Sequence, residues 1–176
     1  MKKNKYIYKN GLIDLAQSKL GSKVVFKTDE FFASANRIIN PDPAIFKEGV
    51  FDSHGKWMDG WETRRKRKKG HDYLIIKFGN PGKISKVDID TSFFNGNQPM
   101  YVSLEACFCK SNIPSKKIKW SKILNNKKTK ANTHHYFKIK SNAIYSHIKL
   151  NIFPDGGVAR LRVYGSMETN KIKFDK

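Results

Sequence analysis

The 176-residue sequence has few cysteines and no long hydrophobic run, and each absence excludes a class of protein. Cys107 and Cys109 are too close for an ordinary disulfide and too few for a zinc site, so we expect a reducing compartment. No run of roughly 18 apolar residues occurs, and the N-terminus lacks the apolar stretch of a signal peptide. The sequence therefore predicts a soluble, cytoplasmic protein with no membrane partner.

Common catalytic motifs are also missing. The sequence has no Gly-Lys-Ser/Thr phosphate loop, no Gly-x-Ser-x-Gly nucleophile elbow and no His-Glu-x-x-His zinc motif. Strand and helix patterns do not alternate along the chain, which argues against a parallel sheet. We therefore expect neither a covalent nucleophile nor an α/β fold.

Acidic residues are scarce: 15 Asp and Glu stand against 35 Lys and Arg, which leaves a net charge of +20. Such a charge can indicate nucleic-acid binding, with an affinity that falls steeply as salt is added. However, 29 of the basic residues are lysines, and aromatic and basic residues are not interleaved along any predicted strand. We therefore expect no nucleic-acid partner and interpret most lysines as solvated surface.

Short segments of alternating polar and apolar residues are the main pattern present, and Gly, Pro, Asn and Asp turns separate them. This pattern predicts an all-β antiparallel β-sandwich or jelly roll. We expect one domain over residues 12–167, with flexible tails at 1–11 and 168–176. Strands are predicted at 23–27, 73–78, 87–90, 102–108, 148–152 and 159–163, more weakly at 118–120 and 137–139, with a turn at 80–82.

The segment 55–72 concentrates chemically active side chains in a predicted long loop. It holds Trp57, Trp61, Asp59, Glu62 and six consecutive basic residues from position 64. One interpretation is a solvated basic run flanked by two core tryptophans. The other is an anion site, since arginine binds a carboxylate through two parallel hydrogen bonds and this chain has only six arginines.

Three further groups could have either a functional or a structural role. His134 and His135 are adjacent on a predicted strand, so they point to opposite faces and at most one enters a given pocket. Asp88 and Asp90 share one strand face and could bind a cation, although two carboxylates are a weak metal signal. In the turn at 151–160, Asp155 and Arg160 could instead form a purely structural pair.

Taken in order, several blocks resemble one known family over almost the whole chain. They are Asp14–Ala16, Lys23–Phe32, Gly55–Arg67, Gly70–Asp72, Val87–Asn97, Asn132–Phe137 and Leu150–Gly165. Together they resemble allantoicase, which cleaves allantoate with water to ureidoglycolate and urea. The resemblance implies a galactose-binding-like jelly roll. Allantoicases typically carry two such repeats in tandem, and this sequence matches one of them, the first.

The resemblance suggests roles for the residues singled out above, because allantoate is a small carboxylate with two ureido groups. We expect Arg64 or Arg65 to bind the carboxylate, with Arg160 as a second candidate. Asp59 or Glu62 would be the general base, and His134 or His135 the acid that protonates departing urea. Trp57 and Trp61 would wall the pocket. Hydrogen bonds to the ureido groups are expected from Asn97, Asn151 and Asp155.

The sequence is compatible with more than one cofactor state, assembly and function. No ligand set requires a metal, although manganese could bind at Asp88, Asp90 and a histidine. A single repeat could restore a missing interface with a second copy, so we expect a homo-oligomer. The alternatives are hydrolysis of a related ureide such as ureidoglycolate, half of a split enzyme, or a ligand-binding subunit without activity.

Overall fold

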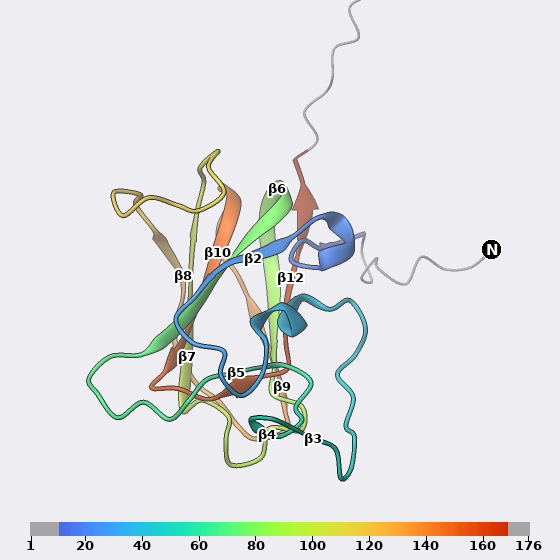
Figure 1. The fold of residues 1–176 in the computed structure, drawn as a ribbon. Helices are drawn as coiled ribbons and strands as arrows, with labels where there is room; N and C mark the ends of the chain where they lie inside the picture. The colour runs from blue at the N-terminus through green and yellow to red at the C-terminus, as the bar shows by residue number, and fades with distance from the viewer. Residues whose placement is uncertain (1–10, 169–176) are drawn as a thin grey trace, which may run out of the picture.

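The computed structural model describes residues 11–168, which form two facing antiparallel layers of strands (Figure 1). Apart from Gly11 and Glu168, the predicted tails lie outside the described residues. The elements are β1 (Ile13–Asp14), η1 (Ser18–Leu20), β2 (Lys23–Lys27), η2 (Ala35–Ile39), β3 (Phe51–Asp52), β4 (Gly55–Lys56), β5 (Trp61–Glu62), β6 (Asp72–Asp90), β7 (Tyr101–Cys107), β8 (Ser121–Lys128), β9 (His134–Lys138), β10 (Ile144–Phe153), β11 (Gly157–Val158) and β12 (Arg160–Met167).

One long strand, β6, belongs to both layers. Its first half pairs with β2 and β10, and β10 continues through β7 to β8. Its second half pairs with β12 and β9, and β12 continues to β1. Figure 1 shows β6 bending in its middle, so that the two halves lie in different layers. At the bend a Cβ on Gly79 would collide with the backbone of Leu20, so this position requires glycine.

The core lies between the layers and is built by the alternation seen in the sequence. Val87 and Ile89 of β6, Leu150 of β10, and Leu161 and Val163 of β12 are completely buried in one cluster. Period-two alternation puts one set of side chains on the inner face of each strand, which explains why the sheets stack there. The predicted all-β antiparallel sandwich is confirmed.

Two local predictions were wrong. The turn expected at 80–82 is a bend inside β6, because strand pairing resumes at Gly82 with Tyr145 and Met167. The strand expected at 118–120 begins only at Ser121, where β8 pairs with Ala106 of β7. In both cases the neighbouring strand decides where pairing occurs, which local sequence does not contain.

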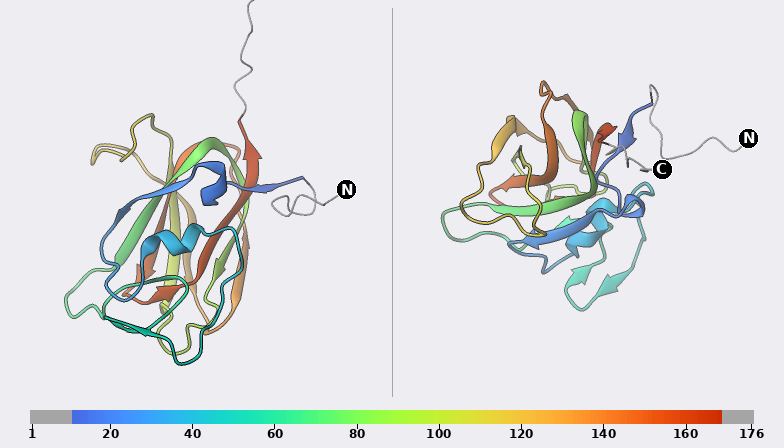
Figure 2. Two further views of the ribbon diagram at one scale, coloured as in Figure 1. Left: turned by 45° about the vertical axis from the view of Figure 1, so that its right-hand side comes forward. Right: turned by 90° about the horizontal axis from the view of Figure 1, so that it is seen from above.

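Most of the long connections gather at the end of the sandwich away from the β6 bend, whereas the connection between β7 and β8 lies near the bend (Figure 2). The small ladders β3–β4 and β5–β11 lie within these connections. The segment predicted as a long loop at 55–72 therefore contains two short strands, β4 and β5. Across residues 11–168, no helix is long and apolar enough to span a membrane.

Candidate active site

Two adjoining pockets open among the connections at this end. The first, the Glu62 pocket, has a volume of about 560 Å³, and the second, the Arg67 pocket, about 730 Å³. They share Phe32, Arg65 and Lys66 in their walls. The Glu62 pocket is lined by Phe32, Glu62, Thr63, Arg65, Lys66, Gly96, Asn97, Gln98, Met100, Pro154, Asp155 and Gly156. The Arg67 pocket is lined by Thr28, Asp29, Phe32, Arg64, Arg65, Lys66, Arg67, Lys68 and Asp72.

Backbone pairing holds Glu62 in the wall of its pocket. Glu62 lies opposite Gly157 in the β5–β11 ladder, and its backbone N–H donates to Ala33 O at 3.1 Å. The next residue, Thr63, donates its N–H to Gly156 O at 3.1 Å. Gly156 has φ 134°, and a Cβ there would lie 2.7 Å from the nitrogen of Pro99. Glycine is therefore required at this position for the three loops to meet.

The Glu62 carboxyl is partly buried and has one side-chain partner. Asn97 Nδ2 donates to Glu62 Oε1 at 2.8 Å. Burial raises the pKa of Glu62 above its ordinary value of 4.5, and the hydrogen bond from Asn97 offsets part of this rise. A carboxyl with a raised pKa exchanges protons more readily near neutral pH, so Glu62 can serve as a general acid or base.

Arg64 and Arg65 are adjacent but differ in what they contact. Arg64 Nη2 lies 2.7 Å from Asp29 Oδ1, and the Arg64 backbone N–H donates to Asp29 Oδ2 at 2.6 Å. Burial acts to raise the pKa of Asp29, but the hydrogen bonds and charge of Arg64 outweigh it and lower the pKa. Arg65 lines both pockets, and its guanidinium has no acidic partner among residues 11–168. Of these two residues, Arg65 is therefore the one whose guanidinium is available to an anionic ligand.

Lys66 joins the two pockets through contacts that the sequence did not reveal. Its backbone N–H donates to Asp155 Oδ2 at 2.7 Å, and its Nζ lies 2.8 Å from Asp72 Oδ1. Thr28 Oγ1 donates to the same Asp72 oxygen at 2.7 Å. Asp155 thus lines the Glu62 pocket and also holds the basic loop, residues 64–69, through its hydrogen bond from Lys66. Sequence reasoning missed Lys66, since nothing distinguishes it from the five basic residues around it.

Asp59 and Arg160 form a pair inside the protein and line neither pocket. Arg160 Nη2 lies 2.7 Å from Asp59 Oδ2, and the exposed fractions of the two side chains are 1% and 8%. The same Asp59 oxygen accepts the N–H of Ile45 at 2.9 Å. The other guanidinium nitrogens donate to backbone carbonyls, including Asp42 O at 3.0 Å and Asp59 O at 3.1 Å. This geometry favours a structural role for both residues.

The two tryptophans also occupy different places. Trp61 is completely buried, and its Nε1–H donates to Asp29 O at 2.7 Å. It therefore supports the loop that holds Arg64. Trp57 contacts the cations of Arg37 and Lys47, whose charged groups lie 5.1 and 4.5 Å from its ring centroid. Neither ring lines the Glu62 pocket or the Arg67 pocket.

The histidines of β9 point to different partners, as alternation predicts. His134 Nδ1 lies 2.8 Å from Asp88 Oδ2, and its Nε2 lies 3.6 Å from Asp90 Oδ1. Burial alone would lower the pKa of His134, but the bond to Asp88 and the two negative charges outweigh it and raise the pKa. His135 Nδ1 donates to Ile89 O at 2.9 Å. Neither histidine lines the Glu62 pocket.

Asn151 belongs to another cluster on β10. Its Nδ2 donates to Ser103 Oγ at 3.2 Å and to Glu105 Oε2 at 3.0 Å. Its Oδ1 lies 3.0 Å from His71 Nε2, which therefore donates. Asn151 thus does not line the pocket that contains Asn97.

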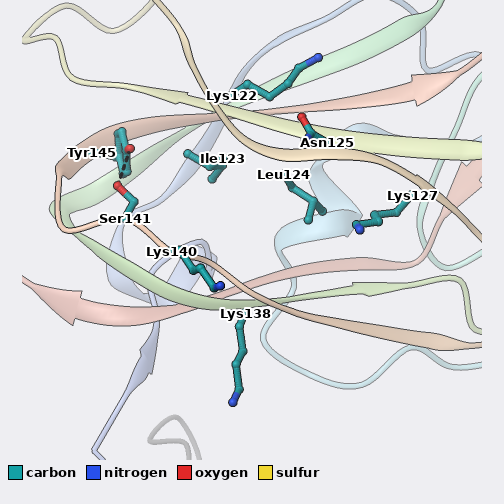
Figure 3. Close-up of a pocket in the computed structure, with 9 residues that line it drawn as sticks. All are labelled: Lys122, Ile123, Leu124, Asn125, Lys127, Lys138, Lys140, Ser141 and Tyr145. Atoms are coloured by element: carbon teal, nitrogen blue, oxygen red, sulfur yellow. Dashed lines mark hydrogen bonds between the residues drawn. The ribbon is translucent and has the colours of Figure 1, made fainter.

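A further pocket of about 550 Å³ lies where β8 approaches the end of β9 (Figure 3). Neither a carboxylate nor a histidine lines it, so it lacks the acid–base group that the Glu62 pocket provides. Its lining residues are Lys122, Ile123, Leu124, Asn125, Lys127, Lys138, Lys140, Ser141 and Tyr145.

Comparison with known proteins agrees with this architecture. The family model described as an allantoicase repeat matches residues 13–168. The chain belongs to the allantoicase family. It is 54% identical over 153 residues to a probable allantoicase of Pseudomonas fluorescens (strain Pf0-1), covering 87% of this chain and 46% of that relative. A probable allantoicase of Pseudomonas aeruginosa (strain LESB58) is 50% identical over the same shares.

Solved structures give the same result. The crystal structure of allantoicase from Saccharomyces cerevisiae is 38% identical with a TM-score of 0.79, over 93% of this chain and 51% of that one. A family 32 carbohydrate-binding module of Clostridium perfringens NanJ in complex with galactose is 16% identical with a TM-score of 0.58, over 86% and 97%. The second likeness shows the fold alone, and it confirms the galactose-binding-like architecture. The chain spans about half the length of the allantoicases it matches.

Proposed function

We propose that this allantoicase repeat hydrolyses allantoate to ureidoglycolate and urea, with the Glu62 pocket as its active site. The observation that carries the proposal is that Glu62, a partly buried carboxyl with a raised pKa, lines one pocket together with Arg65, whose guanidinium has no acidic partner among residues 11–168. Allantoate needs both an acid–base group at its central carbon and a cation for its carboxylate. Both are present in the wall of a cavity large enough for a small molecule.

In the proposed reaction, Arg65 binds the carboxylate of allantoate and so places its central carbon near Glu62. Glu62 removes a proton from water as the water oxygen bonds to that carbon and, in the same step, the bond from the carbon to one ureido nitrogen breaks. Glu62 then passes the proton to the departing nitrogen, which leaves as urea. Asn97 holds the Glu62 carboxyl in position throughout. Gln98 and Asp155, on the same wall, are suited to hydrogen-bond the ureido groups.

Several predicted residues have no direct part in this reaction. Asp59 and Arg160 form a buried ion pair beneath the connections that carry the pockets. Arg64 is bound by Asp29. The proton on the leaving group comes from Glu62 because neither His134 nor His135 lines its pocket. Every proton transfer in the reaction uses a protein side chain. If manganese contributes, chelation will lower the rate and added Mn²⁺ will restore it.

The chain corresponds to about half of each allantoicase it matches, so a second repeat enters the proposal. We propose that a second copy of this chain takes the place of that repeat, in the cytoplasm and without nucleic acid. If so, specific activity rises with protein concentration, in parallel with the dimer fraction measured by light scattering.

The direct test is urea release from allantoate by the purified chain, with Glu62→Gln and Glu48→Gln as matched variants. Glu48 is exposed and lines neither pocket, so its substitution removes the same charge elsewhere. We expect Glu62→Gln to lower the turnover by about 100-fold to 10,000-fold, which is typical of a lost general base. Allantoate binding without urea release by the wild-type dimer would instead indicate a ligand-binding subunit. Faster turnover of ureidoglycolate would indicate the related ureide as substrate.

A further inference from the structure

Cys107, Cys109 and His147 meet on the outer face of the sheet formed by β7 and β10. One ligand atom from each, two Sγ and one imidazole nitrogen, can be chosen so that all three lie within 4.8 Å of one another. His147 is directly opposite Cys107 in the β7–β10 register, and Cys109 follows two residues later, on the same side. Both cysteines are free thiols, and His147 is completely buried.

The hydrogen bonds of His147 orient one of its nitrogens toward the thiols. Nε2 lies 2.9 Å from Asn112 O, a carbonyl that can only accept, so Nε2 carries the proton. Nδ1 therefore presents its lone pair, which accepts from the Ser146 hydroxyl at 2.8 Å and lies 3.5 Å from Cys109 Sγ. A metal ion at Nδ1 would take the place of the Ser146 hydrogen bond. A backbone carbonyl that accepts from the far nitrogen is the usual support of a metal-binding histidine.

We propose that Cys107, Cys109 and His147 bind one zinc ion per chain, with a fourth position left to water. Two thiolates and one imidazole form a ligand set that suits Zn²⁺, whereas Mn²⁺ prefers oxygen ligands. On binding, Zn²⁺ takes the place of the two thiol protons, which pass to the buffer. The sequence alone led us to exclude zinc, because two cysteines are too few for a zinc site. The third ligand, His147, is 38 residues away from Cys109 along the chain and gave no local signal.

The position of this site separates it from the proposed catalysis. His147 pairs with the last residue of β7, whereas Phe153, next to the Glu62 pocket, pairs with the first. Six residues of strand, about 20 Å, lie between them. The loop after β7 passes over the cluster: Ser111 Oγ donates to Cys109 Sγ at 3.5 Å, and Asn112 Oδ1 accepts from Lys77 Nζ at 2.6 Å. The ion would therefore tie this loop to β10.

The test uses the full chain, reduced and metal-free, titrated with Co²⁺ and then with Zn²⁺. We expect Co²⁺ to give thiolate charge-transfer absorption and the visible bands of tetrahedral cobalt, with one equivalent bound and displaced by Zn²⁺. Mn²⁺ should give no displacement. Cys109→Ser and His147→Gln should each weaken binding by more than about 100-fold, beyond the loss typical of a supporting partner. The exposed His54→Gln is the matched control.

A second measurement needs no variant and therefore tests the proposal even if the substituted chains do not fold. In the wild-type chain, Zn²⁺ should protect Cys109, which is partly exposed, from alkylation by iodoacetamide. Absence of cobalt absorption while both thiols are free would overturn the proposal, and so would unchanged binding by folded Cys109→Ser. A disulfide between the two cysteines that persists in reductant would also overturn it. Glu62→Gln should bind cobalt like the wild type, so this result is independent of the proposed catalysis.

Discussion

Asp59 with Arg160 and Glu62 with Arg65 are two acid–arginine combinations at the same end of the sandwich, yet their surroundings are opposite. The first pair is closed off from water, and its guanidinium donates to a carboxylate and several backbone carbonyls. In the second, the acid is only partly buried, and the arginine has no acidic partner among the described residues. The same residue types therefore form a buried ion pair in one case and line an open pocket in the other.

The largest effect is expected from breaking the buried pair of Asp59 and Arg160. Asp59→Ala leaves the Arg160 guanidinium buried without its partner, so we expect the free energy of unfolding to fall by about 3 to 5 kcal/mol. Glu62→Ala removes an acid from a pocket wall and should change it by less than about 1 kcal/mol. Urea denaturation of both variants measures the difference. Equal losses, or a stable Asp59→Ala protein without activity, would contradict the distinction.

The second test compares two arginines of the basic loop. Arg65→Ala should raise the KM for allantoate by about 10-fold to 100-fold, because a charge-assisted hydrogen bond contributes about 1.5 to 3 kcal/mol. Arg67→Ala removes the same charge from a residue that lines only the neighbouring pocket, so its KM should change by less than about threefold. Steady-state urea release gives both values. If the two variants behave alike, the loop acts only through its overall charge.

The third test concerns the pH dependence of Glu62. As a base, Glu62 must be ionised, so activity should rise with pH through its raised pKa, above the ordinary 4.5. Asn97→Ala removes the hydrogen bond that lowers this pKa, and the acidic limb of the pH–activity profile should move to higher pH. A limb that moves to lower pH would contradict the assignment.

The raised pKa of Glu62 also affects stability: the free energy of unfolding of the wild type decreases as pH rises from 4.5 through the folded-state pKa, and Glu62→Gln should abolish this decrease.

The smallest expected effect is at His134, a predicted acid outside the pocket. His134→Gln should leave urea release within about twofold, because its ring binds Asp88 and Asp90 instead of lining the site. Its raised pKa predicts stability that is present below 6.5 and is lost as pH rises through the folded-state value. The variant should lack that pH dependence in thermal unfolding. A large loss of turnover at unchanged stability would return His134 to the mechanism.

Much of the fold could be predicted from the sequence, because period-two alternation is a local property. The buried Val87 and Ile89 and the polar residues between them show it within a few positions. Boundaries were less predictable: β8 begins at Ser121, where β7 is available for pairing, and β6 bends through the Pro81 region instead of ending. Pairing depends on a partner strand that is distant in sequence, so local signals do not place these limits.

By itself, the sequence determined the fold class, the family and the short list of chemically active residues, since alternation and residue type are written along the chain. Only the tertiary structure decided which of these residues meet. It buried Asp59 against Arg160, left Arg65 beside the Glu62 pocket, and brought His147 to Cys107 and Cys109. Each of these outcomes depends on burial and on contacts between distant segments, and both arise only when the sheets close on one another.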